Sequence, residues 1–492
     1  MSLDTLHLFL ALTPILTLLV LSLFSNMKIA AIASFFLTTV LFFVWQNPIN
    51  AYFASLTVAF GMTLNILFII FGALFLFHIM KETGLLERLN HSLEAFHSSK
   101  EIRFFLLTFG LTGLLEGVAG FGTPGALVPF LLISLGYNAT LSISAVLLVD
   151  MIFVAFGAVG TPINIGLTAS LGLSTIDTSR IAMYVGILMT CAAIAVLYFL
   201  LRMYERSHGK MKRDHKQSVV VMFFFFLIPY LLFSFTIPDL ATILSSVVFF
   251  LACFFYLHHS NRKITLRAWI PYGSLIALLI LPKTSPSIQQ LLAKPITIPD
   301  LYSTNMMFSI APWSSPLFAF LLVGLVLMSV YTCHPQNILK ETLHKSIASL
   351  LLLFPVVAIS QLMLHSDAIF PSMIQSISHL FLLFGKTSYL IFAPFIGMLG
   401  SFVSGSNTVS NLIFGSTQLE VAKSIGLNPS IVLALQSAGG AIGSSICLFN
   451  IIAACVIVNL KNTHVILKHN LIPALCACLV VSFAGFALIT FL

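Results

Sequence analysis

The stretch that decides the fold reads Ser401-Phe-Val-Ser-Gly-Ser-Asn-Thr-Val-Ser-Asn-Leu-Ile-Phe-Gly415 and lies between two apolar runs. In hydrocarbon, each polar group without a hydrogen-bond partner costs several kcal/mol, so this stretch must line a cavity or pack inside the protein. Gly405 and Gly415 allow the backbone to bend. The pattern predicts a re-entrant hairpin or a broken helix whose tip, residues 404–415, lies at mid-membrane depth.

Such a tip can bind a small anion without any full positive charge. Hydroxyl groups, amides and the free backbone N–H groups at a helix N-terminus supply the donors. Small residues at this depth can also serve helix packing alone, but a polar cluster with a counterpart elsewhere in the chain favours a binding site. The candidate substrate-binding residues here are Ser404, Ser406, Asn407, Thr408, Ser410 and Asn411.

A second glycine-rich stretch, Glu116-Gly-Val-Ala-Gly-Phe-Gly-Thr-Pro-Gly125, lies far upstream and is also flanked by apolar arms. Each stretch is followed by a similar segment, Ser134-Leu-Gly-Tyr-Asn138 in one case and Ser424-Ile-Gly-Leu-Asn428 in the other. Next come Phe156-Gly-Ala-Val-Gly160 and Gly439-Gly-Ala-Ile-Gly443. Three matched pairs in the same order predict an internal repeat. Two repeats that face one midplane site are the usual plan of secondary transporters. The further substrate-binding candidates are Gly120, Phe121, Gly122, Thr123, Gly439, Gly440 and Ser444.

The composition places the chain in the membrane. Of its 492 residues, 59% are hydrophobic and 8% are charged, which is typical of a polytopic membrane protein. The formal net charge of +8 is explained by topology. If the basic loop 202–217 is cytoplasmic, most of the 23 basic residues fall on the cytoplasmic side. No nucleic-acid partner is therefore needed.

This orientation makes the repeat inverted, because the first glycine-rich region then enters from the cytoplasm and the second from the opposite face. We expect an all-α polytopic membrane protein with inverted repeats, two re-entrant hairpins, broken transmembrane helices and about 11–14 membrane segments. The expected divisions are N-terminal helices over 1–56; a first inverted repeat over 57–202, with hairpin tip 116–125 and broken helix 141–173; a basic cytoplasmic loop over 203–217; connecting and scaffold helices over 218–345; and a second inverted repeat over 346–492, with hairpin tip 404–415 and broken helix 430–460.

Two acidic residues, Glu116 and Asp150, are placed at membrane depth, and no basic residue is placed there. A carboxyl group within a membrane is by default a functional candidate. An apolar setting favours its neutral form, so either residue can carry a proton. The alternative is a neutral structural acid that is hydrogen-bonded to the hairpin backbone.

The motifs at 116–124, at 154–160, at 404–415 and at 437–443 resemble those of the L-lactate permease family. The resemblance covers nearly the whole chain. It implies a bacterial inner-membrane symporter that moves lactate or glycolate with protons. The triplet Ser406-Asn407-Thr408 is also similar to the hairpin-tip signature of the wider elevator-type ion transporter group, which includes dicarboxylate carriers.

The sequence departs from this family pattern at positions that carry charge. Asn407 stands where the family usually has an acid, and Ser444 stands where it has a lysine. Asp150 occupies an asparagine-like position, and Cys447-Leu448-Phe449 replaces Ser-Pro-Gln. One acid is lost and another is gained, and a cation that could face a substrate carboxylate is missing.

We therefore expect a secondary active transporter that imports a small monocarboxylate, L-lactate or a glycolate-like 2-hydroxy acid, by proton symport. The alternative is a sodium-coupled carrier of a dicarboxylate or another organic anion. An enzyme is not expected. The chain has no His-Glu-x-x-His motif, no P-loop, no second aspartate at membrane depth and no histidine placed to pair with Ser404 or Ser406. The expected partners are the substrate anion and the lipid bilayer. A homodimer is left open, and no cofactor or metal site is expected.

Overall fold

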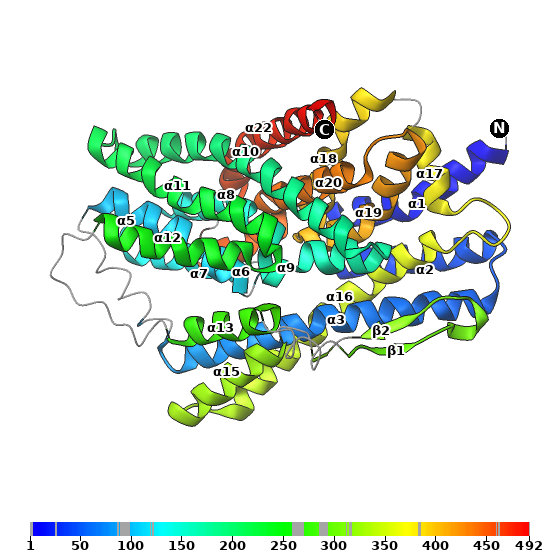
Figure 1. The fold of residues 1–492 in the computed structure, drawn as a ribbon, viewed down its shortest axis with the longest axis horizontal. Coiled ribbons are helices and arrows are strands. Elements are labelled where there is room, and N and C mark those ends of the chain that lie inside the picture. Colours follow the sequence, from blue (N-terminus) through cyan, green and yellow to red (C-terminus); the bar gives the residue numbers. More distant parts are fainter. Residues whose placement is uncertain are drawn as a thin grey trace.

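The computed structural model describes residues 3–24, 27–85, 88, 99–118, 120, 123–257, 270–284, 294–310, 312–313, 317–381, 385–458, 460 and 463–491. Figure 1 shows that most of these residues form helices. The helices up to residue 208 are α1 (Leu3–Phe24), α2 (Met27–Val44), α3 (Ile49–Glu82), α5 (Lys100–Leu106), α6 (Thr112–Val118), α7 (Thr123–Ser134), α8 (Ala139–Phe153), α9 (Gly157–Ile163) and α10 (Thr175–His208). Those that follow are α11 (Arg213–Thr236), α12 (Ala241–Leu257), α13 (Ile270–Thr284), α15 (Leu317–Val330), α16 (Pro335–Leu364), α17 (Met373–Phe381), α18 (Gly385–Ser404), α19 (Asn407–Ser424), α20 (Pro429–Gly443), α21 (Leu448–Ile457) and α22 (Thr463–Phe491).

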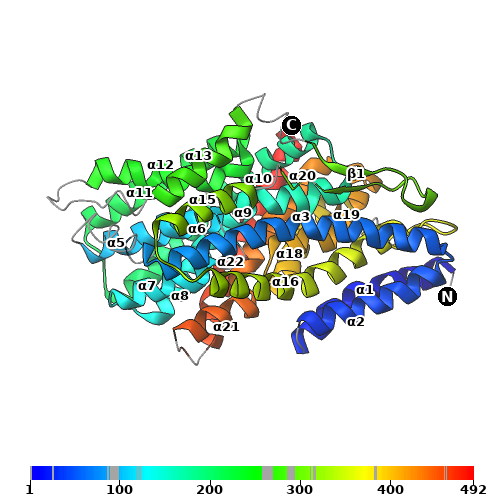
Figure 2. The same cartoon turned by 90° about the horizontal axis from the view of Figure 1, so that it is seen from below.

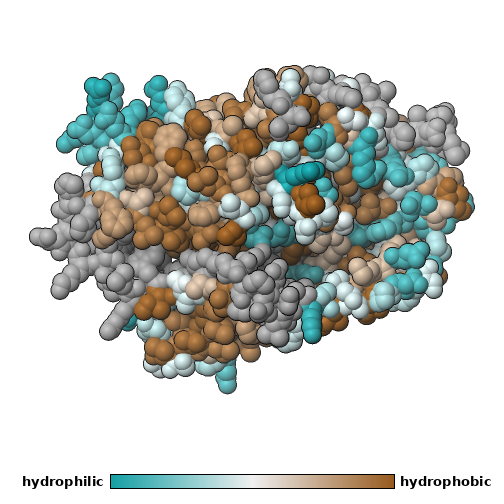
Figure 3. All heavy atoms as spheres, in the orientation of Figure 1, coloured by the Kyte–Doolittle hydropathy of each residue, from teal (hydrophilic) through white to brown (hydrophobic). Residues whose placement is uncertain are grey.

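Long apolar helices dominate this part of the chain. The stretches that are long and apolar enough to cross a membrane are Ala139–Ala169, Thr175–His208, Arg213–Thr236, Pro238–Leu257, Pro335–Leu364 and Thr463–Thr490. Large apolar side chains such as Phe255 and Phe483 are exposed on the outside, and Figure 3 shows hydrophobic residues along much of one face. An all-α polytopic membrane protein is thus confirmed, while the expected number of membrane segments stays a prediction.

The stretch 401–415 contains a sharp break between two helices. Helix α18 ends at Ser404, Gly405 adopts a φ of +75°, and α19 begins at Asn407. Ser406 caps the new helix, because its Oγ accepts a hydrogen bond from the backbone N–H of Val409 at 3.4 Å. The positive φ explains the glycine at position 405.

The upstream glycine-rich region has a similar break. Helix α6 ends at Val118, Gly120 has a φ of +58°, and α7 begins at Thr123. Phe121 and Gly122 lie outside the described residues. Both predicted tips therefore interrupt helices, whereas their re-entrant path stays a prediction.

The segments that follow each tip also match in local structure. Gly136 and Gly426 both have positive φ, and Asn138 and Asn428 each cap the next helix with a side-chain oxygen. The helices that follow, α8 and α20, both pass into a short 3₁₀ turn, over Val154–Phe156 and Ser444–Ile446 respectively. These likenesses support the internal repeat, and its inverted arrangement stays a prediction.

The helix break that follows α8 is more distorted than the one that follows α20. Ala158, Val159 and Gly160 all have left-handed φ values, 43°, 57° and 73°. Such backbone is unfavourable for residues with a side chain and persists only where the surroundings hold it. A π-helical segment, Asn164–Ala169, completes this stretch.

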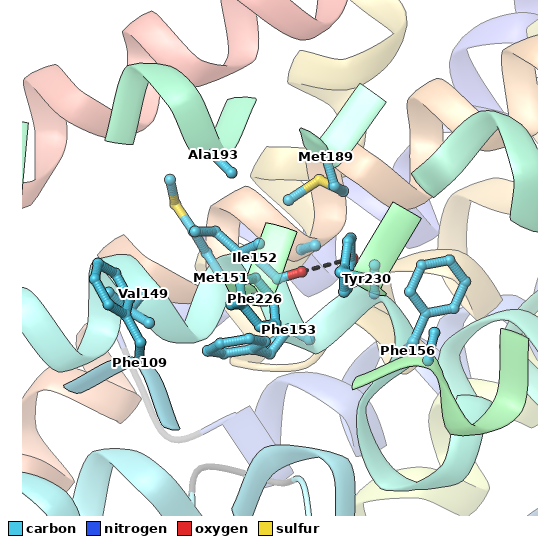
Figure 4. Packing of buried hydrophobic residues seen from close by; sticks show 14 of the residues in the cluster. Phe109, Val149, Met151, Ile152, Phe153, Phe156, Met189, Ala193, Phe226 and Tyr230 are labelled. Carbon is cyan, nitrogen blue, oxygen red and sulfur yellow. Dashed lines mark hydrogen bonds between the residues drawn. The ribbon is translucent and has the colours of Figure 1, made fainter. Parts of the chain in front are cut away.

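Neighbouring helices satisfy the carbonyl groups that this break leaves free. The hydroxyl of Tyr230 donates to the carbonyl oxygen of Ile152 at 2.7 Å, and that of Thr242 donates to Phe153 at 3.0 Å. Figure 4 shows Tyr230 reaching Ile152 within a core of tightly packed aromatic and aliphatic side chains. The break is therefore anchored to α11 and α12.

Helices α18 and α20 pack backbone against backbone. A Cβ atom at Gly439 would collide with the carbonyl of Pro394, and one at Gly443 would collide with that of Met398. A Cβ atom at Gly397 would collide with the carbonyl of Gln436. These glycines allow the close approach that membrane helices commonly use.

A second group of helices lies beside this bundle. Figure 2 shows α1 and α2 paired next to the long helices α3 and α16. A short antiparallel sheet, β1 (Ile296–Ile298) with β2 (Phe308–Ile310), lies along α3. Asn65 of α3 donates to the carbonyl of Ser309 at 3.3 Å. The sequence did not predict this sheet.

The predicted basic loop lies next to the start of α5. His215 Nδ1 is 3.4 Å from Glu101 Oε2, and the Ser99 hydroxyl donates to the same oxygen at 2.6 Å. The Ser99 hydrogen bond, together with the nearby His215 and Lys212, holds the pKa of Glu101 below its usual range. Residues 99–101 therefore lie beside the connection between α10 and α11. The loop predicted over 203–217 is shorter than expected, because α10 continues to His208 and α11 begins at Arg213. Its cytoplasmic placement stays a prediction.

We predict that Gly439→Ala lowers thermal stability. The added methyl group must displace a backbone carbonyl, and overpacking of this kind typically costs about 1–3 kcal/mol. Thermal unfolding of the purified protein in detergent measures the effect. The control is Gly273→Ala on α13, where nothing lies within 4 Å of an added Cβ; it should leave Tm unchanged or slightly raised. Equal Tm values for Gly439→Ala and the wild type would contradict the close packing of α18 and α20.

Candidate functional site

The helix breaks meet at one small, partly open cavity. Its walls come from α6, from the break after α8, from the α18–α19 break and from the α20–α21 break. The described lining residues are Glu116, Asp150, Val154, Gly157, Ala158, Pro162, Gly405, Ser406, Asn407, Thr408, Ser444 and Asn450. Segments from both predicted repeats thus contribute to the same site.

The cavity brings together several residues that the sequence singled out. Glu116 and Asp150 lie on the same walls as the polar tip Ser406–Thr408 and Ser444. Positions 407 and 444, where the sequence departs from the family pattern, therefore face one cavity.

Other predicted residues do not line the cavity but lie beside it. Ser404 Oγ donates to the carbonyl of Gly400 at 2.8 Å, and Ser410 Oγ donates to that of Gly397 at 2.7 Å. Gly439 lies against Pro394, as described above, and Gly440 faces Asn407 Oδ1.

The first tip is described only in part. Gly120 lies against Ala158, so this tip touches the left-handed turn of the broken helix. Phe121 and Gly122 are outside the described residues, and Thr123 begins α7. Their predicted role in substrate binding stays a prediction.

Hydrogen-bond donors at the cavity come from the N-terminus of α19. The backbone N–H groups of Asn407 and Thr408 belong to the first turn and have no partner within the helix. Thr408 also lines the cavity, and its hydroxyl group can donate a hydrogen bond. The partial positive charge of the helix end favours an anion here.

The acceptors at the cavity include a pair of carboxyl groups. Glu116 and Asp150 are 3% and 5% exposed, and their side chains are within hydrogen-bonding reach of each other. Gly157 makes room for Glu116, since a Cβ atom there would collide with Glu116 Oε1. Glu116 Oε2 and Asp150 Oδ1 are buried without a described partner. Two carboxyl groups that line one buried cavity repel each other strongly if both are ionised.

No Lys, Arg or His occurs among the described residues that line this cavity. Ser444 donates its hydroxyl proton to the carbonyl of Ala441 at 2.7 Å and so offers only lone pairs to the cavity. Of the described residues, no three or more His, Cys, Asp or Glu side chains are grouped to hold a metal ion.

Buried amide side chains form a hydrogen-bond network beside the tip 404–415. Asn411 Nδ2 donates to the carbonyl of Pro162 at 3.0 Å and to Ser437 Oγ at 3.2 Å. Gln436 Nε2 donates to Ser410 Oγ at 3.1 Å, and Gln418 Nε2 donates to Gln436 Oε1 at 3.0 Å. The bond from Asn411 to Pro162 joins the tip of the second repeat to the broken helix of the first.

Asn450, Gln436 and the role of Gly157 were not predicted from the sequence. Asn450 and Gln436 are amides within apolar runs, and the cost of an unsatisfied amide in hydrocarbon was the signal that could have found them. Nothing in the sequence alone indicated that Gly157 accommodates Glu116, because this contact joins two separate helices.

The fold and the cavity are those of a membrane transport protein. The chain is built from apolar spanning helices, and its polar cavity lies where broken helices meet. The chain belongs to the L-lactate permease family, whose model matches residues 7–271 and 259–492. Membership in a permease family shows a transporter and not an enzyme.

Bacterial relatives span nearly the same length. The L-lactate permease of Escherichia coli K12 is 27% identical over 482 residues, which is 87% of this chain and 86% of that protein. The L-lactate permease of Bacillus subtilis is 24% identical over 84% of this chain and 83% of its own. The glycolate permease GlcA of Escherichia coli K12 is 24% identical over 88% and 87%.

We predict that Asn411→Ala lowers the free energy of unfolding by about 1 kcal/mol, because a buried carbonyl and a serine hydroxyl lose their shared partner. Thermal unfolding in detergent measures this loss. The matched control is Ser416→Ala on the same helix, where the buried hydroxyl has no described partner; it should change Tm little. If both variants unfold at the same temperature, the Asn411 bonds do not hold the two regions together.

Proposed function

We propose that the protein imports a small monocarboxylate, L-lactate or a glycolate-like 2-hydroxy acid, by proton symport across the bacterial cytoplasmic (inner) membrane. The names of its relatives, lactate and glycolate permeases, support the substrate class. One observation supports the coupling. The cavity combines a helix N-terminus suited to an anion with two carboxyl groups and no basic side chain among its described lining residues.

Electrostatics gives the reason for coupling. Two like unit charges 4 Å apart repel by about 4 kcal/mol at an effective dielectric constant of 20. A substrate carboxylate that enters beside an ionised Glu116–Asp150 pair meets this repulsion, and no lining cation offsets it. Protonation of the pair removes the repulsion. Proton and anion therefore bind better together than either binds alone.

The proposed cycle follows from these positions. The substrate carboxylate accepts hydrogen bonds from the N–H groups of Asn407 and Thr408 and from the Ser406 and Thr408 hydroxyls. A proton on Glu116 or Asp150 accompanies it, so the cavity carries little net charge as it changes its side of access. On the other side the anion leaves and the carboxyl pair releases the proton.

Alternating access of this kind fits an inverted repeat. The matched breaks near Gly120 and Gly405, and the matched caps at Asn138 and Asn428, support two equivalent halves around one cavity. We propose that the two halves present this cavity to each side in turn, by an elevator-type movement. The Asn411 bond to Pro162 would keep the cavity intact during that movement.

The charges that line the cavity do not favour the alternative, a sodium-coupled carrier of a dicarboxylate. A second substrate carboxylate would bring further negative charge to walls that already carry two acids. No described lining side chain supplies a compensating positive charge.

We predict that Glu116→Gln and Asp150→Asn separate coupling from transport. A variant that has lost the proton carrier should fail to accumulate L-lactate in proteoliposomes under a proton gradient. It should still exchange internal for external L-lactate without a gradient. The control is Glu420→Gln, which alters an acid paired with Lys423 at 3.1 Å, away from the cavity; it should accumulate as the wild type does. Unchanged accumulation and pH dependence in both cavity variants would overturn proton coupling through this pair.

A further inference from the structure

Asn450 joins the two helix breaks of the second repeat. It lies near the start of α21, where its Nδ2 donates to the carbonyl of Gly405 at 3.2 Å and to that of Ser444 at 3.1 Å. Gly405 is the turn between α18 and α19, and Ser444 opens the turn after α20. One side chain therefore satisfies a free carbonyl at each break.

These two bonds fix which way the amide points. A backbone carbonyl only accepts hydrogen bonds, and an amide nitrogen has two hydrogens to donate. If the amide were turned over, its oxygen would face two carbonyl oxygens and both bonds would be lost. The amide nitrogen is therefore fully used, and Oδ1 is the polar side-chain atom of Asn450 that is left for another partner.

Asn450 lines the cavity and is only partly buried. No described residue donates a hydrogen bond to its Oδ1. This oxygen is also not among the fully buried polar atoms that lack a hydrogen-bond partner. The other amide on the wall differs in this respect. Asn407 Oδ1 is sealed against Gly440 of α20. Asn450 thus presents an oriented, accessible acceptor to the cavity.

An acceptor of this kind cannot bind a carboxylate, which has no hydrogen to donate. It suits a hydroxyl group. The N–H groups proposed to hold the carboxylate belong to Asn407 and Thr408, and Asn450 is bonded to Gly405 just before them. Carboxylate donors and a hydroxyl acceptor therefore lie on adjacent parts of one wall. A 2-hydroxy acid carries its hydroxyl on the carbon next to the carboxylate.

We propose that Asn450 Oδ1 accepts a hydrogen bond from the 2-hydroxyl group of the substrate and so selects 2-hydroxy acids over acids that lack this group. This role rests on the proposed function and names the residue that selects its substrate class. Propionate lacks the donor entirely. Pyruvate would place a carbonyl oxygen against Oδ1, so it should bind no better than propionate.

The test is competition against radiolabelled L-lactate uptake by purified protein in proteoliposomes. Unlabelled L-lactate, propionate and pyruvate are the competitors. One hydrogen bond that only L-lactate makes should give the wild type about a tenfold preference for L-lactate over propionate. Asn450→Ala should reduce this ratio to near one, whatever its effect on the overall rate. General damage to the site would weaken the binding of L-lactate and of propionate alike, and would leave the ratio of their affinities unchanged.

The matched control is Asn470→Ala. Asn470 Nδ2 donates to the carbonyl of Ser445 at 3.0 Å, so it supports the same turn after α20 without lining the cavity. This variant should keep the wild-type ratio.

If Asn450→Ala yields no folded protein, two other measurements still test the role of Asn450. One is the wild-type preference for L-lactate over propionate. The other is the same ratio in Asn450→Ser, whose shorter side chain cannot place an acceptor at the position of Oδ1. A ratio near one in the wild type, or an unchanged ratio in a folded Asn450 variant, overturns the role of Asn450. Absence of any L-lactate uptake by the wild type would instead overturn the proposed function, and this inference with it.

Discussion

The structure depends on one constraint: a backbone N–H or carbonyl group inside a membrane must find a hydrogen-bond partner within the protein. Each break in a helix creates several such groups, and this chain breaks its helices near Gly120, Gly157, Gly405 and Ser444. Side chains from other helices satisfy the carbonyls that result. Tyr230 and Thr242 serve the first broken helix, and Asn450 and Asn470 serve the second. The breaks are stable because they are packed together, and the residues around them line a polar cavity.

The same constraint shapes the electrostatics of the cavity. Helix ends supply N–H donors, so an anion can be held without a lysine or arginine. When they are ionised, the two carboxyl groups that face this site repel the anion, and a bound proton removes this repulsion. This chain has the neutral residues Asn407 and Ser444 on the cavity wall and the acids Glu116 and Asp150 beside them, whereas the resemblance described above implies an acid at 407 and a lysine at 444. Because all four residues line one cavity, the differences alter the charge of a single site.

Some features of the cavity were predictable from the sequence. Polar residues 404–411 in an apolar setting predicted the helix break, and Glu116 and Asp150 were singled out because carboxyl groups at that depth are rare. Contacts between distant helices were not predictable in the same way. Gly439 was expected in the binding site, but it lies against the backbone of Pro394 as helix packing requires. Asn450 was missed because its significance comes from two carbonyls, at 405 and 444, that the fold brings within its reach. The sheet formed by β1 and β2 was missed because each strand is only three residues long and prolines at 295 and 299 flank the first, which favours a loop.

The most direct test of proton-coupled import is the uptake of radiolabelled L-lactate by the wild-type protein in proteoliposomes, with proton and sodium gradients imposed separately. With an acidic exterior and no sodium, L-lactate should accumulate inside above its external concentration, and a protonophore should abolish this accumulation. With a sodium gradient at equal pH on both sides, no accumulation should occur. Accumulation driven by sodium alone, with no response to the proton gradient, would contradict coupling through Glu116 and Asp150.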